Sequence, residues 1–124
     1  MAKTIMIVDD SPLMRASLKA NLELGGFKVE FAGDGVLALN QLKSGVKPDL
    51  IITDVNMPNM GGLEFIRNLR VLPGFRFTPV LVLTTESHQD KKDEAKKHGA
   101  TGWLVKPVSG PDLIKVIKQV LPGA

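Results

Sequence analysis

The sequence predicts a single domain of the α/β class, in which five parallel strands alternate with five helices on both faces of the sheet. Three observations point to this class. Residues 5–8, 50–53 and 80–83 lack polar alternation, which is typical of strands buried on both faces. The segments between the strands show helical spacing of apolar residues and are bounded by capping residues and glycines. Strict alternation of strand and helix requires right-handed crossovers, and therefore a parallel sheet.

The first strand, residues 5–8, leads into a helix. Ser11 and Pro12 predict its start, because a serine side chain accepts hydrogen bonds from free amides and proline suits the first helical position. Two glycines at 25–26 end the helix by permitting a left-handed turn. Its predicted inward residues, spaced four apart, are Met14, Leu18 and Leu22.

The second strand, residues 27–31, alternates apolar with charged side chains. One of its faces therefore meets water, and it is predicted to lie at an edge of the sheet. A turn at 33–35 leads to a short helix that ends before Pro48 and feeds the strand at 50–53. The inward residues of this helix are Ala38, Leu39 and Leu42.

The third helix begins at Gly61 and Gly62 and ends at Pro73, and it precedes the strand at 80–83. Its inward residues are Phe65, Ile66, Leu69 and Leu72. The fourth helix, residues 88–98, has Ala95 as its only apolar residue. It can bury little surface, so we expect it to be the least firmly held.

A short last strand, residues 102–105, and a helix capped by Ser109 complete the chain. The apolar residues of this last helix follow helical spacing and are Leu113, Val116, Ile117, Val120 and Leu121.

The composition, 44% hydrophobic and 23% charged, is that of an ordinary globular protein. The absence of cysteine excludes disulfides, thiolate chemistry and cysteine-ligated zinc. No apolar run is long enough for a signal peptide or a membrane span, so we expect a cytoplasmic protein without a membrane partner. The net charge of +3 is mildly basic, but no helix-turn-helix or basic aromatic pattern accompanies it, so we expect no nucleic-acid partner.

Asp54 ends the strand at 50–53. The carboxyl ends of the strands form the rim where open α/β sheets bind ligands. If the first and third strands are neighbours, Asp9 and Asp10 emerge at the same rim. Three close carboxylates repel one another, and either protonation of one of them or a divalent cation relieves the repulsion. Because the ligands are hard oxygens without histidine or cysteine, the pattern predicts Mg²⁺ together with a phosphorylated group.

Three further residues reach this rim from later strands. Lys106 supplies a positive charge for a phosphoryl oxygen or a free carboxylate, and Thr84 offers a hydroxyl. Asn56 can lend its backbone carbonyl to the metal. Asp54 itself can accept a phosphoryl group, since carboxylates form acyl phosphates beside a metal. Each residue alone has an ordinary explanation as a turn or cap residue, but the whole set at strand ends favours a functional site.

Four motifs carry a resemblance to a known family: the Asp-Asp pair at 9–10, Thr-Asp-Val-Asn-Met-Pro-Asn-Met-Gly-Gly at 53–62, Leu-Thr-Thr-Glu at 83–86 and Lys-Pro at 106–107. The chain resembles the receiver domain of response regulators, and specifically the stand-alone, CheY-like chemotaxis regulators. The resemblance covers essentially all of residues 1–124 as one receiver domain. It implies a flavodoxin-like, doubly wound (βα)5 fold with strand order 2-1-3-4-5, a cis peptide bond before Pro107 and a monomer.

The resemblance also implies a function, that of a phosphorylation-activated switch rather than an enzyme with turnover. Asp54 would accept a phosphoryl group from a CheA-like histidine kinase, with Lys106 and Thr84 contacting the phosphoryl oxygens. Asn56 and Glu86 would influence how fast that group is hydrolysed. The implied magnesium site consists of Asp9 through a water, Asp10, Asp54 and the backbone of Asn56.

Phosphorylation is expected to draw Thr84 toward the rim and to let an aromatic side chain of the last strand move inward. The resemblance implies that this side chain is Trp103. The alternative, that Trp103 is only a half-buried packing residue, stays open.

The family's usual partner surface is formed by the fourth helix, the last strand and the last helix, and its partner would be a flagellar motor switch protein or a phosphatase. Lysines on this surface favour an acidic partner, although neighbouring acids make an ordinary solvated face the alternative. These lysines are Lys91, Lys92, Lys96, Lys97, Lys115 and Lys118.

Other functions remain open. A phosphate sink or a non-chemotactic single-domain regulator would use the same chemistry. A magnesium-dependent phosphatase of the haloacid dehalogenase type also uses a strand-end Asp, but its second Asp, a general acid, corresponds to Asn56 here. An adaptor that ignores phosphorylation is disfavoured because the whole acidic set is present.

Overall fold

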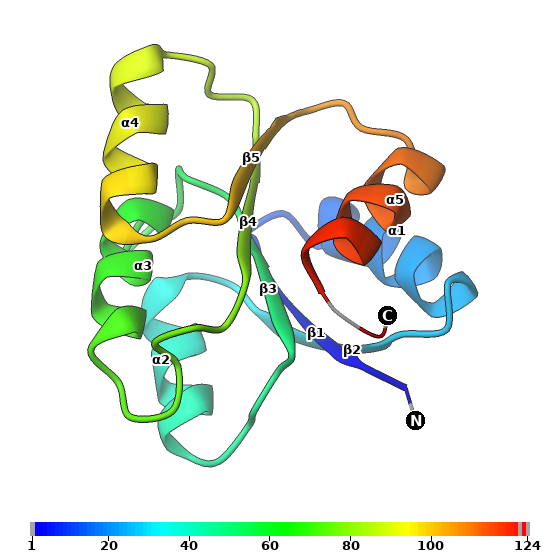
Figure 1. The fold of residues 1–124 in the computed structure, drawn as a ribbon, viewed down its shortest axis with the longest axis horizontal. Coiled ribbons are helices and arrows are strands. Elements are labelled where there is room, and N and C mark those ends of the chain that lie inside the picture. The colour runs from blue at the N-terminus through cyan, green and yellow to red at the C-terminus, as the bar shows by residue number, and fades with distance from the viewer. Residues whose placement is uncertain (1, 122, 124) are drawn as a thin grey trace.

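A computed structural model describes residues 2–121 and 123, and it confirms the predicted class. One parallel sheet has the strand order β2-β1-β3-β4-β5 (Figure 1). The strands are β1 (Thr4–Val8), β2 (Lys28–Ala32), β3 (Leu50–Thr53), β4 (Val80–Thr84) and β5 (Gly102–Val105). The helices are α1 (Pro12–Leu24), α2 (Gly35–Lys43), α3 (Gly62–Arg70), α4 (Gln89–His98) and α5 (Gly110–Val120).

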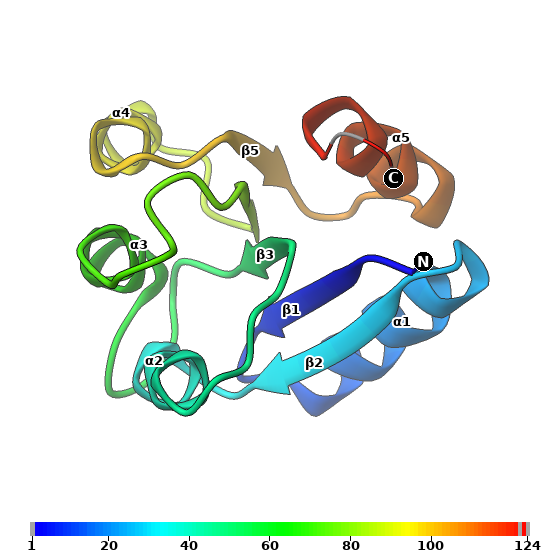
Figure 2. The same ribbon diagram turned by 60° about the horizontal axis from the view of Figure 1, so that its bottom comes forward.

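The helices form a layer on each face of the sheet. Helices α1 and α5 cover one face, and α2, α3 and α4 cover the other (Figure 2). Each layer encloses its own apolar cluster, because successive residues of a strand point to opposite faces. Ile7 and Ile52 belong to the cluster under α1 and α5, whereas Met6 and Ile51 belong to the other.

The strand patterns are confirmed. Strands β1, β3 and β4 are central, and β3 and β4 are buried along their whole length. Strand β2 lies at an edge, with Lys28 and Glu30 exposed. It begins one residue later than predicted, because the N–H of Phe27 donates to the carbonyl of Leu22 at the end of α1 rather than to the sheet.

Several helix ends follow the predicted signals, but α3 ends at Arg70, before the predicted stop at Pro73, so Leu72 lies outside the helix. The hydroxyls of Ser11 and Ser109 accept hydrogen bonds from the amides of Met14 and Asp112, each at 3.2 Å. Gly99 ends α4 with a φ of 104°, a left-handed conformation that favours glycine. Ala95 is the only buried residue of α4, as expected. In the described residues no helix is both long and apolar enough to cross a bilayer.

Candidate functional site

Lys106 joins two carboxylates at the carboxyl rim of the sheet. Its Nζ lies 3.1 Å from Oδ2 of Asp9 and 3.1 Å from Oδ2 of Asp54. Burial alone would lower the pKa of Lys106, but the hydrogen bonds and negative charges of Asp9 and Asp54 outweigh burial and raise it. The amine therefore carries a positive charge at neutral pH and lies between two acids.

The strand register explains this meeting of distant residues. Val8 pairs with Thr53, so the residues that follow them, Asp9 and Asp54, leave the sheet side by side. The amide of Asp54 donates to the carbonyl of Val8 at 3.0 Å. Lys106 arrives from β5, and its amide donates to the carbonyl of Thr84 at 2.8 Å.

The chain turns sharply after Asp54. Its Oδ1 accepts the amide of Val55 at 2.6 Å, and the amide of Gly62 donates to the carbonyl of Val55 at 2.8 Å. A Cβ atom at Gly62 would lie 2.0 Å from the carbonyl oxygen of Asp54. The turn therefore requires glycine at 62 because the backbone of α3 starts directly against the backbone of Asp54.

The structure brings the predicted acids together only in part. Asp9 is buried, and its Oδ1 accepts the amide of Ser11 at 2.9 Å. Asp10 and Asn56 are exposed beside the rim. Within residues 2–121 and 123, no three Asp, Glu, His or Cys side chains are grouped as ligands for one ion. The expected cluster of three acids is thus a pair bridged by Lys106.

The donor atoms nevertheless suit magnesium. Mg²⁺ commonly takes one or two carboxylates and completes its shell with water and phosphate oxygens. Asp9 and Asp54 supply two carboxylates, Asp10 adds a third that faces solvent, and Asn56 follows Asp54 closely in the chain. A hard dication is therefore compatible with these residues.

Glu86 connects Thr84 with Trp103. Thr84 is fully buried, and its hydroxyl oxygen accepts the amide of Glu86 at 3.2 Å. The indole N–H of the half-buried Trp103 donates to the carbonyl of Glu86 at 3.1 Å. The carboxylate of Glu86 lies 2.5 Å from Nδ1 of His88. One residue thus links the end of β4 to the aromatic side chain of β5.

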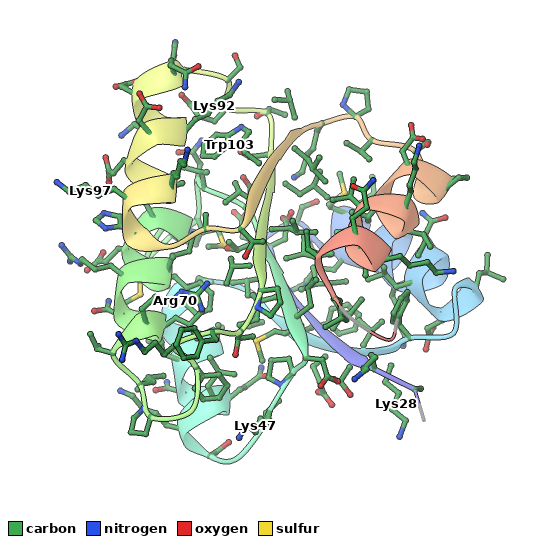
Figure 3. The ribbon with its side chains drawn as sticks, in the orientation of Figure 1. Lys28, Lys47, Arg70, Lys92, Lys97 and Trp103 are labelled. Atoms are coloured by element: carbon green, nitrogen blue, oxygen red, sulfur yellow. The ribbon has the colours of Figure 1, made fainter. Side chains whose placement is uncertain are left out.

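A recess separates α4 from β5. It has a volume of about 290 Å³, and its walls include Trp103, Lys92 and Lys96. Figure 3 shows Lys92 beside Trp103, with Lys97 on the outer side of α4. Within the described part of the chain, the lysines of α4 form no ion pair, since Asp93 pairs with Gln89 and Glu94 with His98.

Two contacts were not expected from the sequence, one beside the site and one at the opposite end of α3. The carboxylate of Asp34, regarded as a turn residue, is buried and accepts the side-chain amide of Asn59 at 2.8 Å. The guanidinium of Arg70 donates to the carbonyls of Phe75, Thr78 and Gly99 at 2.7–2.8 Å. Burial lowers the pKa of Arg70. Only the residue type of Asp34, which is common at helix N-caps, could have pointed to its role at the start of α2.

The peptide bond between Lys106 and Pro107 is cis, as expected.

Comparisons with known proteins agree with this geometry. The profile described as "Response regulator receiver domain" matches residues 5–118. Protein PilH of Pseudomonas aeruginosa is 38% identical over 122 residues, which cover 96% of this chain and 98% of PilH. The structure of Vibrio cholerae chemotaxis protein CheY4 has 43% identity and a TM-score of 0.92, with 98% of this chain and 100% of that chain covered.

A second structure shares the fold. The receiver domain of the Pseudomonas aeruginosa sensor histidine kinase PA1611 carries a magnesium ion in its active-site cleft. It covers 97% of this chain and 98% of its own, with a TM-score of 0.88 and 23% identity. This likeness shows a shared fold.

Proposed function

This chain belongs to the response regulator receiver domain family, and from that premise we propose that it accepts a phosphoryl group from a histidine kinase on Asp54 and thereby changes its partner binding. The observation that carries the proposal is the position of Lys106, within 3.1 Å of both Asp9 and Asp54. A lysine in this place can follow the negative charge as it moves from a carboxylate to a phosphoryl oxygen.

The proposed step is a phosphoryl transfer between two side chains. An oxygen of Asp54 attacks the phosphorus of a kinase phosphohistidine, the phosphorus–nitrogen bond breaks, and the imidazole leaves with the electron pair. Asp54 then carries an acyl phosphate. Hydrolysis of that bond returns the free carboxylate and inorganic phosphate, so the domain resets itself.

Residues of this chain prepare Asp54 for that step. Lys106 holds Oδ2, and the amide of Val55 holds Oδ1, so the carboxylate has a fixed orientation. Both donors also lower the cost of bringing an anionic phosphoryl group to an anionic carboxylate. Bound Mg²⁺, held by Asp9, Asp10, Asp54 and the carbonyl of Asn56, would supply further charge neutralisation.

The contacts of Thr84 suggest how phosphorylation reaches the surface. The hydroxyl oxygen of Thr84 accepts the amide of Glu86, which leaves its proton free to donate to a phosphoryl oxygen. A movement of Thr84 toward the rim would shift the Glu86 peptide. Trp103 is bonded to the carbonyl of that residue, and so its position would change with the state of Asp54.

The surface built from α4, β5 and α5 is the proposed partner site, and chemotaxis is the proposed context. Trp103 lies in the recess between α4 and β5, with Lys92 and Lys96. Because the α4 lysines have no ion pair among the described residues, the surface favours an acidic segment of a kinase, motor switch protein or phosphatase.

Intact-protein and peptide mass spectrometry test the proposal. After incubation with acetyl phosphate and Mg²⁺, we expect one added phosphate, located on Asp54 and absent from the Asp54→Asn variant. No added phosphate, or phosphate on another residue, contradicts the proposal. Sustained turnover of p-nitrophenyl phosphate would instead support the phosphatase alternative.

A further inference from the structure

We propose that Asp34 positions the phosphoacceptor loop, defined as residues 54–62, through its hydrogen bond to Asn59. The inference rests on the proposed function, because it concerns how efficiently that loop presents Asp54 and the carbonyl of Asn56. Asp34 would be a positioning residue that does not touch the phosphoryl group.

The carboxylate of Asp34 has two tasks. Oδ1 accepts the amide of Leu37 at 2.9 Å and caps α2, whereas Oδ2 accepts the side-chain amide of Asn59 at 2.8 Å. Only 4% of Asp34 is exposed, so its two oxygens depend on these two donors, of which Asn59 lies on the exposed loop. Oδ1 is thus used to cap α2, and Oδ2 is used to bind the side chain of Asn59 in the loop.

A backbone contact strengthens the same junction. The amide of Gly35 donates to the carbonyl of Met60 at 3.1 Å. A Cβ atom at Gly35 would lie 2.8 Å from Cγ of Met60. The start of α2 and the far end of the loop therefore approach as closely as a glycine allows, with two polar contacts between them.

The backbone of Asn59, whose side chain contacts Asp34, has an unusual conformation. Its φ is 65°, and it is the only non-glycine residue with positive φ among the described residues. This conformation is disfavoured for side chains, although asparagine tolerates it better than most. The hydrogen bond to Asp34 helps to hold the backbone of Asn59 in this conformation. A second hydrogen bond, from the amide of Gly62 to the carbonyl of Val55, joins the two ends of the loop.

Loss of the hydrogen bond between Asp34 and Asn59 is expected to affect both Mg²⁺ binding and phosphorylation of Asp54. Residues behind the direct ligands of a site fix ligand orientation, and their loss typically costs about 10–100-fold in metal affinity or activity. Releasing Asn59 frees the middle of the loop while Lys106, Asp9 and Asp54 are unchanged. We expect weaker Mg²⁺ binding and slower formation of the acyl phosphate.

The main variant is Asn59→Gly. Glycine adopts a φ of 65° without strain, so the variant removes the side-chain contact and keeps the backbone conformation. We expect about a tenfold loss in Mg²⁺ affinity by isothermal titration calorimetry, and a similar loss in the rate of phosphate incorporation from acetyl phosphate. Unchanged values for both would overturn the proposal.

An exchange of the two side chains separates positioning from general damage. Asp34→Asn combined with Asn59→Asp keeps an acceptor for Leu37 and restores an amide–carboxylate pair in reverse. We expect the double variant to recover most of the affinity and rate that Asn59→Asp alone loses, since that single variant places two carboxylates together. Equal defects in the single and double variants would overturn the proposal.

Thr101→Val is the matched control. The Thr101 hydroxyl also ties a loop to the fold, by accepting the amide of Val80 at 3.0 Å, but it lies at the opposite edge of the sheet. We expect it to lower the melting temperature without changing Mg²⁺ affinity.

The parent protein distinguishes the two proposals. If the parent takes up no phosphate, the proposed function is refuted. If the parent is phosphorylated normally and the Asn59 variants are unaffected, only the role of Asp34 is refuted.

Discussion

Trp103 donates its indole N–H to the carbonyl of Glu86, while the amide of Glu86 donates to the hydroxyl of Thr84. The three residues belong to β4, β5 and the segment between β4 and α4. Two hydrogen bonds therefore connect the buried Thr84 to the half-buried indole of Trp103, which is fluorescent.

Beryllofluoride with Mg²⁺ should change the emission of Trp103, the only tryptophan of the chain. The physical reason is that a shift of the Glu86 peptide alters the hydrogen bond and the polarity around the indole. Steady-state fluorescence measures it, with Asp54→Asn as the unresponsive control. Thr84→Val should retain Mg²⁺ binding and lose most of the emission change. An unchanged spectrum in the parent would separate Trp103 from the switch and leave it a packing residue.

Lys106→Met should destabilise the protein by about 2 kcal/mol at pH 7, because it leaves Asp9 and Asp54 facing each other without their shared donor. Urea unfolding measures the loss. Mg²⁺ should stabilise this variant more than the parent, since a dication replaces the missing charge. An equal effect of Mg²⁺ on both proteins would indicate that the carboxylates do not meet the ion.

The hydrogen bond from the Asn59 amide, followed by that from the Leu37 amide, lowers the pKa of Asp34 below its usual range. A depressed pKa of an acid means that its contribution to stability is present above about pH 3.9, the ordinary value, and is lost as pH falls through the lower folded value. Asn59→Gly removes the largest cause. Its stability relative to the parent should recover in part below that pH, as acid titration of the unfolding free energy would show. A constant difference would contradict this.

The pKa of Lys106 is shifted in the opposite direction, so its contribution to stability depends on pH in the opposite sense. Its pKa is raised in the folded state, so its stabilising contribution is complete below about pH 10.4 and is lost only as pH rises through the higher folded value. The stability difference between the parent and Lys106→Met should therefore stay constant from neutral pH to about pH 10. A decline that begins near pH 8 would mean that the folded-state pKa of Lys106 is lowered rather than raised.

Arg70→Lys should destabilise the protein by about 2 kcal/mol, because one ammonium group cannot reach the carbonyls of Phe75, Thr78 and Gly99 at once. Since Gly99 ends a helix with one buried residue, amide exchange at the end of α4 should accelerate as well. Arg67→Lys, on the exposed side of α3, is the control and should stay within about 0.5 kcal/mol of the parent. An equal loss of stability in Arg70→Lys and Arg67→Lys would contradict the prediction.

The sequence determined much of this protein by itself. Runs without polar alternation predicted the central strands, and the alternation at 27–31 predicted the edge strand, because side chains must match the solvent on each face of a sheet. The same reasoning placed Asp9, Asp54, Thr84 and Lys106 at one rim, since residues that end parallel strands share an edge. The lack of apolar residues in α4 correctly predicted that it buries little.

Only the tertiary structure decided which of those rim residues touch. Lys106 bridges Asp9 and Asp54, while Asp10 faces solvent, a difference that depends on where the chain turns after each strand. His98 belongs to a helix with one apolar residue, yet it is half-buried and lies 3.6 Å from Glu94. Burial on a helix depends on the neighbouring elements as well as on the pattern.

The contacts Asp34–Asn59 and Arg70–Gly99 join residues 25 and 29 positions apart. Local propensity carries no information on such pairs, because their partners are chosen by the packing of loops that leave no periodic pattern in the sequence. Periodicity thus specified the sheet and the position of the rim, and the tertiary structure decided which residues at the starts of α2 and α3 contact the loop that carries Asp54.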